Sequence, residues 1–264
     1  MSNTFTFETI PAAQVTETML DQAAALFSSA YGIWSPEAEK NMGKYCKPGK
    51  RVKMSVERLR EQSLAPGTNS VLVRSIDGDK LAGYAFATRW MYEGRQICWV
   101  TQLCVSHEYR GRKLATQILI RLREGQNDRG FGILSSHPAA ILGALRAWGR
   151  GIEDVNMEIA KEHAAGIMAA SPVKYVRDAK LKGSLFGSGD DGTVCCADTS
   201  FWVDHAEPFA ALAEIKKRAT WPFGDLPEGC EFLVLAQHLD LKNTISSHYI
   251  TCEAQIESSV SRTL

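Results

Sequence analysis

Hydrophobic and polar positions change their period within one stretch of the chain, Ile97–Glu124. Ile97–Val105 has two alternating faces, and both are largely apolar, which is typical of a central strand buried on both sides. From Leu114 onward the apolar residues fall four apart, so they share one face of a helix. The pattern therefore predicts a buried strand, a turn over Ser106–Gly111 and an amphipathic helix.

The same two periods predict the other elements of the chain. Strands are expected at Phe5–Thr9, Ser70–Ser75, Leu81–Trp90, Phe131–Ser135, Thr199–His205 and Phe232–Ala236. Helices are expected at Gln14–Ala30, Ser55–Leu64, Ala139–Trp148, Ile152–Ala170 (with Asp154 as a candidate N-cap) and Pro208–Arg218. Val173–Val176 is expected to be extended, and the polar tail after Ala236 is expected to be partly disordered.

Turn residues indicate how the strands connect. Asp77-Gly78 marks a hairpin, and Glu93-Gly94 marks a second turn that leads into the central strand. The strand–helix–strand order from Ile97 to Ser135 indicates a parallel crossover. Short linkers favour a single domain over residues 1–264, in which an extension of about 151–240 completes a core of about 5–150. We therefore expect an α/β (α+β) fold with a mixed, mostly antiparallel sheet and helices on both faces.

The turn between the central strand and the helix, Arg110–Ala115, has the composition of an anion site. The first N–H groups of a helix have no partner within it, and the helix dipole adds partial positive charge there. Arg110, Arg112 and Lys113 would strengthen such a site, and Gly111 would let the backbone approach a ligand. Two or more phosphates in a row would suit it. A basic surface turn before an ordinary helix would carry the same residues, so the spacing leaves both interpretations open.

The segment Ser106–Leu119, after a strand that ends in LCV, resembles motif A of the GNAT (GCN5-related) N-acyltransferase superfamily. That motif, Q/R-x-x-G-x-G/A, cradles the pyrophosphate of acetyl-CoA in the family. Arg110 matches its first position and Ala115 its last, whereas Lys113 stands where the middle glycine is usual. We expect binding to survive provided that Lys113 keeps a negative φ. The resemblance covers about Ser70–Gly149, and the wider pattern is similar to GNAT-like proteins of filamentous fungi.

The resemblance implies an acyl-CoA-dependent N-acetyltransferase with acetyl-CoA as cosubstrate and no metal. In such enzymes the amine attacks the thioester directly, and a backbone N–H of the central strand meets the oxyanion. The residues so implied in CoA binding are Leu103, Cys104, Val105, Arg110, Gly111, Arg112, Lys113, Leu114, Ala115 and Thr116. Tyr31 and Trp34 fall in the segment that forms part of the acceptor site in the family, although they would equally serve to cover the core.

The usual catalytic residues of the family are absent. A glutamate often lies on the central strand, on the face that Trp99 and Thr101 occupy here, and a tyrosine is common where Leu145 stands. Thr101 would at most orient a water molecule. His137 follows a strand and precedes a helix, and its side chain titrates in the useful range, so it is the first candidate general base. The alternative is a helix-capping histidine.

The other candidate catalytic residues can also be explained by structural roles. Asp204 and His205 place a carboxylate beside an imidazole at the end of an expected strand, but Asp204 would also cap the helix that follows. Cys104, in a buried strand, is more consistent with packing than with covalent catalysis. His163 falls on an apolar helix face and is expected to be a core residue.

Composition narrows the remaining classes of function. The 264 residues are 45% hydrophobic and 23% charged, as in a globular chain. A net charge of +0 gives no general attraction to nucleic acid or to anionic membranes. The seven cysteines include no C-x-x-C and no metal-ligand spacing, and we recognise no signal peptide or membrane span. We expect a reducing compartment, most simply the cytoplasm, and a nuclear location stays open.

Two functional classes remain. The first is an N-acetyltransferase that acts on the primary amine of a small molecule or of a protein. The second is a non-catalytic acyl-CoA-binding module, a sensor or scaffold, which the missing glutamate and tyrosine would favour. We favour the enzyme because the catalytic groups of the family vary widely. Neither the acceptor amine nor the oligomeric state follows from the sequence, and no nucleic-acid or membrane partner is expected.

Overall fold

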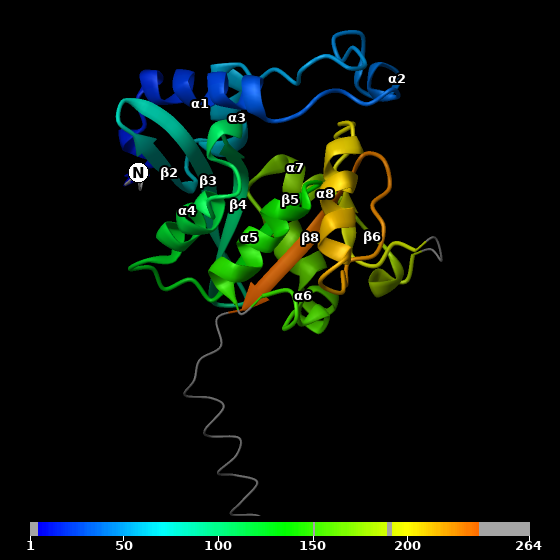
Figure 1. Ribbon diagram of the computed structural model, residues 1–264. Helices are drawn as coiled ribbons and strands as arrows, with labels where there is room; N and C mark the ends of the chain where they lie inside the picture. Colours follow the sequence, from blue (N-terminus) through cyan, green and yellow to red (C-terminus); the bar gives the residue numbers. More distant parts are fainter. Residues whose placement is uncertain (1–4, 150, 189–191, 238–264) are drawn as a thin grey trace, which may run out of the picture.

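A computed structural model describes residues 5–149, 151–188 and 192–237. One eight-stranded sheet runs through it in the order β1-β2-β3-β4-β5-β8-β7-β6. Most neighbouring strands are antiparallel, β4 and β5 are parallel, and helices cover both faces (Figure 1). The expected mixed α/β fold is confirmed. The tail that we expect to be partly disordered lies outside the described residues, apart from Gln237 at the end of β8.

The elements have the following bounds. The strands are β1 (Thr6–Pro11), β2 (Asn69–Asp77), β3 (Lys80–Tyr92), β4 (Arg95–Val105), β5 (Gly130–Ser135), β6 (Lys180–Lys182), β7 (Cys196–Asp198) and β8 (Cys230–Gln237). The α-helices are α1 (Glu17–Ala30), α2 (Ala38–Met42), α3 (Val56–Ser63), α4 (Leu114–Arg123), α5 (Pro138–Trp148), α6 (Met157–Ala169), α7 (Lys174–Asp178) and α8 (Ala206–Lys216).

Helices α1 and α3 cover one face of β2–β4. Each begins at a hydroxyl cap, because Thr16 and Ser55 accept a hydrogen bond from the N–H three residues later. Their apolar faces pack on Tyr84 and Phe86 of β3, and these two side chains are fully buried. The apolar stripe of α4, which contains Ile118, packs against β2 and β3 as part of a separate core that also includes α5.

Strands β4 and β5 pair over only part of their length. The parallel register runs from Ile97 opposite Gly130 to Val100 opposite Ile133. Within it the Trp99 ring lies so close to Gly132 that a Cβ on this glycine would be 2.2 Å from Cε3 of the ring. A glycine is therefore required opposite this tryptophan.

Beyond this register the two strands separate. The pairing of β4 with β3 shifts between Gln102 and Val100, which leaves Thr101 as the extra residue of a β-bulge. Strand β5 continues beside β8 as far as Ser135. The last residues of β4, Thr101–Val105, thus have no strand partner on the β5 side.

The C-terminal half enters the same sheet. Strand β8 lies between β5 and β7, so the last described strand occupies an interior position. It pairs along the whole of β5, from Gly130 opposite Gln237 to Ser135 opposite Phe232. Helix α6 packs against β8, and the Trp90 indole of β3 donates a 3.1 Å hydrogen bond to the Ile167 carbonyl oxygen of α6.

The prediction of a strand at Thr199–His205 is wrong. Strand β7 ends at Asp198, whose Oδ1 accepts a 2.9 Å hydrogen bond from the Ser200 N–H. Ser200 has a φ of 55°, a left-handed conformation that interrupts a strand. The apolar residues that follow pack instead against the segment after α1, where Val203 forms an isolated bridge with Trp34.

Three predictions around α6 and α7 are also wrong. Val173–Val176 is not extended, because α7 begins at Lys174 and the Ser171 hydroxyl accepts a 3.1 Å hydrogen bond from the Val173 N–H. Helix α6 starts later than expected, since its cap is Asn156 and not Asp154. The His163 side chain is 25% exposed at the helix edge, so it is not a core residue.

Candidate functional site

The turn between β4 and α4 has an unusual backbone. Gly111 has a φ of 77° and Lys113, the residue before α4, has a φ of 59°. The expected negative φ of Lys113 is therefore wrong: this lysine adopts the left-handed conformation that glycine adopts readily. For a non-glycine residue this costs roughly 1–2 kcal/mol, so the turn keeps its shape against a local cost.

The turn presents free backbone donors. Within the described ranges, no atom accepts a hydrogen bond from the N–H groups of Arg112, Lys113, Leu114 or Ala115. The first intrahelical acceptor is the Lys113 carbonyl oxygen, which receives the Gln117 N–H at 3.1 Å. Four free N–H groups at the positive end of a helix make an anion site.

The three cations of the turn do not act alike. Arg110 donates to Glu207 Oε1 of α8 at 2.5 Å and to the Ala30 carbonyl oxygen of α1 at 2.7 Å. The Arg112 guanidinium lies 5.5 Å from the centre of the Tyr109 ring. Lys113 is exposed and has no ion-pair partner within the described residues. Arg110 therefore joins three elements, whereas Arg112 and Lys113 have no carboxylate partner among the described residues.

His137 lies where the sequence predicts, between β5 and α5, but its contacts favour the capping interpretation. Nδ1 accepts a 3.1 Å hydrogen bond from the Ala139 N–H at the start of α5. Nε2 lies 3.9 Å from Oε1 of Glu207. Burial lowers the pKa of the His137 imidazole, and the Glu207 carboxylate opposes this effect. A catalytic role for His137 stays an untested prediction.

The contacts of Asp204 and His205 also favour structural roles over catalytic ones. Asp204 Oδ1 accepts a 2.8 Å hydrogen bond from the Ala206 N–H at the start of α8, whose cap position is His205. The His205 ring is buried against Phe209, and neither ring nitrogen has a hydrogen-bond partner in the described part of the chain. Burial lowers its pKa. Neither of these two residues nor His137 lines the cavity that opens between β4 and β5.

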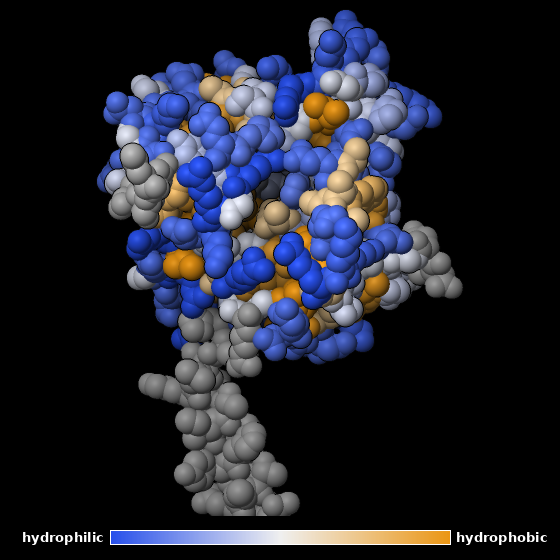
Figure 2. Space-filling model, viewed as in Figure 1, coloured by the Kyte–Doolittle hydropathy of each residue, from blue (hydrophilic) through white to orange (hydrophobic). Residues whose placement is uncertain are grey.

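A cavity of about 180 Å³ opens where β4 and β5 separate. Val100 and Leu103 of β4, Leu134 and Ser135 of β5, and Phe27 of α1 form part of its wall. In Figure 2 this face of the molecule is hollowed near its centre, beneath the layer of α1 and α2. The cavity thus occupies the region of the sheet where β4 and β5 diverge.

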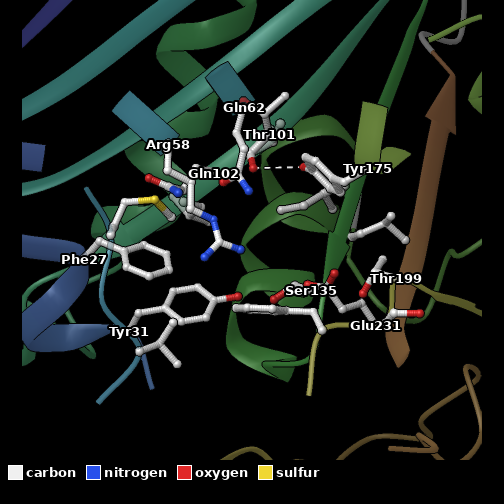
Figure 3. A pocket seen from close by; sticks show the side chains of 18 of the residues that line it. Phe27, Tyr31, Arg58, Gln62, Thr101, Gln102, Ser135, Tyr175, Thr199 and Glu231 are labelled. Carbon is white, nitrogen blue, oxygen red and sulfur yellow. Dashed lines mark hydrogen bonds between the residues drawn. The ribbon is translucent and has the colours of Figure 1, made fainter. Parts of the chain in front are cut away.

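The predicted residues of β4 contribute unequally to this cavity. Thr101 and Leu103 line it, and the Thr101 hydroxyl has no hydrogen-bond partner among the described residues. The Tyr175 hydroxyl of α7 donates a 2.9 Å hydrogen bond to the Thr101 carbonyl oxygen (Figure 3). Cys104 is buried on the other side, and burial raises the pKa of its thiol to about 12. It therefore carries no thiolate near neutral pH.

Glu231, at the start of β8, is the carboxyl group of this cavity and is not among the predicted site residues. Its side chain lines the cavity and is 7% exposed. Burial raises its pKa to about 7, and a hydrogen bond from the Thr199 side chain opposes this rise. No cation pairs with it within residues 5–149, 151–188 and 192–237. A carboxyl group of this pKa is suited to proton transfer near neutral pH.

Two tyrosines face the same space. Tyr31 lines the cavity, as the sequence analysis allows, whereas Trp34 is buried in a separate cluster with Val203. Burial and the nearby Glu231 raise the pKa of Tyr31 and of Tyr175, so both hydroxyls stay protonated at neutral pH. In Figure 3, Arg58 and Tyr31 lie on one side of the cavity and Thr199 and Glu231 on the other.

One signal in the sequence could have identified Glu231. The run Cys230–Ala236 is apolar except for this single glutamate. A lone carboxylate in an otherwise buried strand is rare unless it has a role. The expected strand began one residue later, at Phe232, and so left Glu231 in the preceding loop.

Among the described residues, no group of three or more His, Cys, Asp and Glu side chains is arranged to hold a metal ion. In the same residues, no helix has both the length and the apolar character needed to cross a bilayer.

The sequence matches no protein-family model and no curated protein sequence. Its structure is similar to several solved structures, among them a GNAT family N-acetyltransferase. Examples are ElaA from Escherichia coli (12% identity, 50% of this chain and 78% of that chain, TM-score 0.33) and NAA60 from Arabidopsis thaliana in complex with a bisubstrate analogue (15%, 54% and 82%, 0.36). A third is YhbS from Escherichia coli, a GNAT family N-acetyltransferase in complex with CoA (19%, 53% and 67%, 0.35).

These likenesses extend over about half of this chain and concern the fold alone. With TM-scores below 0.5 they carry no conclusion about activity, which has to come from the site. The similarity to proteins of filamentous fungi and the cytoplasmic location stay predictions.

Proposed function

We propose that this protein is an acyl-CoA-dependent N-acyltransferase, with acetyl-CoA as the acyl donor and a primary amine as the acceptor. One observation carries the proposal: β4 ends in a turn of free backbone donors, and along the same strand it separates from β5 to open a cavity that contains a buried carboxyl group. An anion site and a proton acceptor thus flank one strand edge.

The anion site would hold the pyrophosphate of CoA. Its donors are the N–H groups from Arg112 to Ala115, and the unpaired Lys113 adds positive charge. The turn is tied to the cavity through Arg110, because its guanidinium binds the carbonyl oxygen of Ala30 and the next residue, Tyr31, lines the cavity. A pantetheine arm would run from the turn into the gap beside Thr101–Val105.

Glu231 would act as the general base. A lysine-like amine of pKa ~10.4 must lose a proton at pH 7, at a cost of roughly 4.6 kcal/mol. A base whose pKa lies near the working pH offsets part of that cost, and the pKa of Glu231 is about 7. This residue takes the place of the glutamate that the family resemblance would put at Trp99 or Thr101.

The remaining steps need little from side chains. The amine nitrogen attacks the thioester carbonyl, the C–S bond breaks, and CoA leaves as a thiolate. A thiol of pKa about 8.5 is a good leaving group and needs little protonation. Backbone N–H groups at the unpaired edge of β4 would stabilise the oxyanion, and holding both reactants together accounts for much of the acceleration.

The direct test is CoA release from acetyl-CoA with a panel of amines, combined with calorimetry of acetyl-CoA binding. We expect binding, and amine-dependent release that Glu231→Gln lowers by about a hundredfold or more. Binding without release for every amine would identify the non-catalytic acyl-CoA module instead. No binding would return the turn to a basic surface loop and end both interpretations.

A further inference from the structure

We infer that the acceptor is a small primary amine that also carries a carboxylate, which Arg58 binds at the mouth of the cavity. This inference rests on the proposed function for the identity of the reacting amine. The site itself can be tested by binding, without any turnover.

Arg58 is available for such a ligand. It belongs to α3, lines the cavity and is exposed, and its side chain makes no ion pair or hydrogen bond with any described residue. Figure 3 shows its guanidinium reaching into the cavity on the side of Tyr31. Arg60, two residues further along the same helix, is instead ion-paired to Glu17. Helix α3 therefore presents one arginine that is ion-paired, Arg60, and one that has no such partner among the described residues, Arg58.

The cavity has opposite charges at its two ends. Lys53 and Arg58 are its exposed cations, and Glu231 is the carboxyl group in its lining. An aminocarboxylate has the same polarity: its amine would meet Glu231 and its carboxylate would meet Arg58. A simple amine would leave the guanidinium unused, and a diamine would place a second cation against it.

The chemistry of the guanidinium favours a carboxylate, and the size of the cavity favours a small ligand. An arginine side chain binds a carboxylate through two parallel N–H···O bonds, which adds geometric selectivity to charge. The cavity of about 180 Å³ is smaller than the roughly 300–1,000 Å³ of pockets for drug-sized ligands. Phe27, Tyr31 and Phe201 in the wall would contact an apolar or aromatic side chain of the ligand.

The experiment measures calorimetric binding of matched pairs to CoA-saturated protein: phenylalanine with phenylalaninamide, and β-alanine with β-alaninamide. The same pairs are then compared as acceptors by CoA release. In at least one pair we expect the acid to bind at least about tenfold more tightly than the amide, which corresponds to about 1.4 kcal/mol. Arg58→Ala should remove that difference and raise KM for the acid with little change in kcat, and Arg58→Lys should restore part of it.

Arg60→Ala is the matched control and should leave the ratio of acid to amide unchanged. Arg58→Glu should reverse the preference, so that an aliphatic diamine binds better than β-alanine. Equal binding of acid and amide by the wild-type protein would overturn the inference, and so would a loss of acetyl-CoA affinity in Arg58→Ala, because Arg58 would then serve a phosphate of CoA. Failure of CoA release with every amine would contradict the proposed function. Arg58-dependent binding of the acid would still support the carboxylate-binding site at Arg58.

Discussion

The Tyr175 hydroxyl and the Thr101 carbonyl oxygen are joined by a 2.9 Å hydrogen bond across 74 positions of the chain. Thr101 is the bulged residue at which β4 leaves β5. A carbonyl group at a separated strand edge lacks its ladder partner, and leaving it buried and unsatisfied would be costly. The bond therefore allows the two strands to diverge while α7 stays fixed beside the cavity.

Tyr175→Phe should lower the free energy of unfolding by about 1 kcal/mol, because the buried Thr101 carbonyl loses its donor. Acceptor KM should rise with little change in acetyl-CoA affinity. Chemical denaturation and steady-state kinetics measure both effects. Tyr45→Phe is the control, since the Tyr45 side chain is 84% exposed and should tolerate the change. Equal stability of the two variants would mean that this hydrogen bond contributes nothing.

Glu231→Gln should lower kcat by about a hundredfold or more, the scale of a lost general base. In the wild-type protein kcat should rise as the pH passes through about 7, because burial holds the pKa of Glu231 there and the carboxylate is the active form. The tyrosines that face it, Tyr31 and Tyr175, have raised pKa values and stay neutral over this range. A variant that keeps the wild-type rate and pH profile would place the base elsewhere.

The same substitution should stabilise the fold at high pH. The pKa of Glu231 rises on folding from 4.5 to about 7, so the folded state binds the proton more tightly than the unfolded state. Its favourable contribution is complete below about pH 4.5 and is lost as the pH rises through 7, which amounts to a loss on the order of 3 kcal/mol.

Glu231→Gln cannot ionise and should therefore exceed the wild-type free energy of unfolding at pH 8.5 but not at pH 4.5. The exposed Glu61, changed to Gln, serves as the control and should show no such difference. Denaturant titrations at the two pH values give the result. A constant gap between Glu231→Gln and wild type would mean that Glu231 does not change its proton affinity on folding.

Lys113→Gly should raise the free energy of unfolding by about 1 kcal/mol, because it relieves a left-handed lysine. The N–H group remains, so acetyl-CoA affinity should fall by no more than a few-fold through the lost cation. Arg112→Gly is the matched control: Arg112 lacks a positive φ, so glycine there brings no relief and loosens the unfolded chain. Thermal melts measure the change in stability, and calorimetry measures acetyl-CoA affinity. A Lys113→Gly variant less stable than wild type would show that the backbone of Lys113 is not strained.

His137 separates capping from catalysis through two substitutions. If His137 is the general base, both His137→Ala and His137→Asn should lower turnover by about tenfold or more. If His137 is only a helix cap, His137→Ala should lower the free energy of unfolding by about 1 kcal/mol. His137→Asn should then keep both stability and rate, because the asparagine side chain can accept a hydrogen bond from the Ala139 N–H. The contacts of Nδ1 favour the second outcome. A stable but inactive His137→Asn would restore the histidine as a candidate base.

Local patterns predicted the elements around the turn because each had its own signal. The change of period at Leu114 gave the start of α4 correctly, and the two-sided apolar run placed β4 in the sheet interior. The strand predicted at Thr199–His205 was wrong because the alternation of apolar residues there reflects packing against Trp34. Strand β7 ends before this segment, and the left-handed Ser200 prevents its continuation. The left-handed Lys113 was missed because sequence patterns carry no φ angle.

The base candidate was missed for a different reason. Glu231 acquires its raised pKa and its place across the cavity from Tyr31 only when β8 pairs with β5, more than ninety residues earlier in the chain. Ser135 and Phe232 are neighbours in the sheet, yet nothing local to either residue encodes the other. The distance between two residues along the sequence does not predict a contact that forms through such long-range strand pairing.

The interior position of β8 has a consequence for synthesis. A chain emerging from the ribosome presents β5 long before its neighbour β8 exists. A largely apolar strand edge therefore stays open while roughly a hundred further residues are added, which takes several seconds at typical rates. During that interval the nascent chain exposes a template for pairing with other chains. The last described strand thus brings Glu231 into the cavity and also covers the β5 edge that would otherwise be free to pair with other chains.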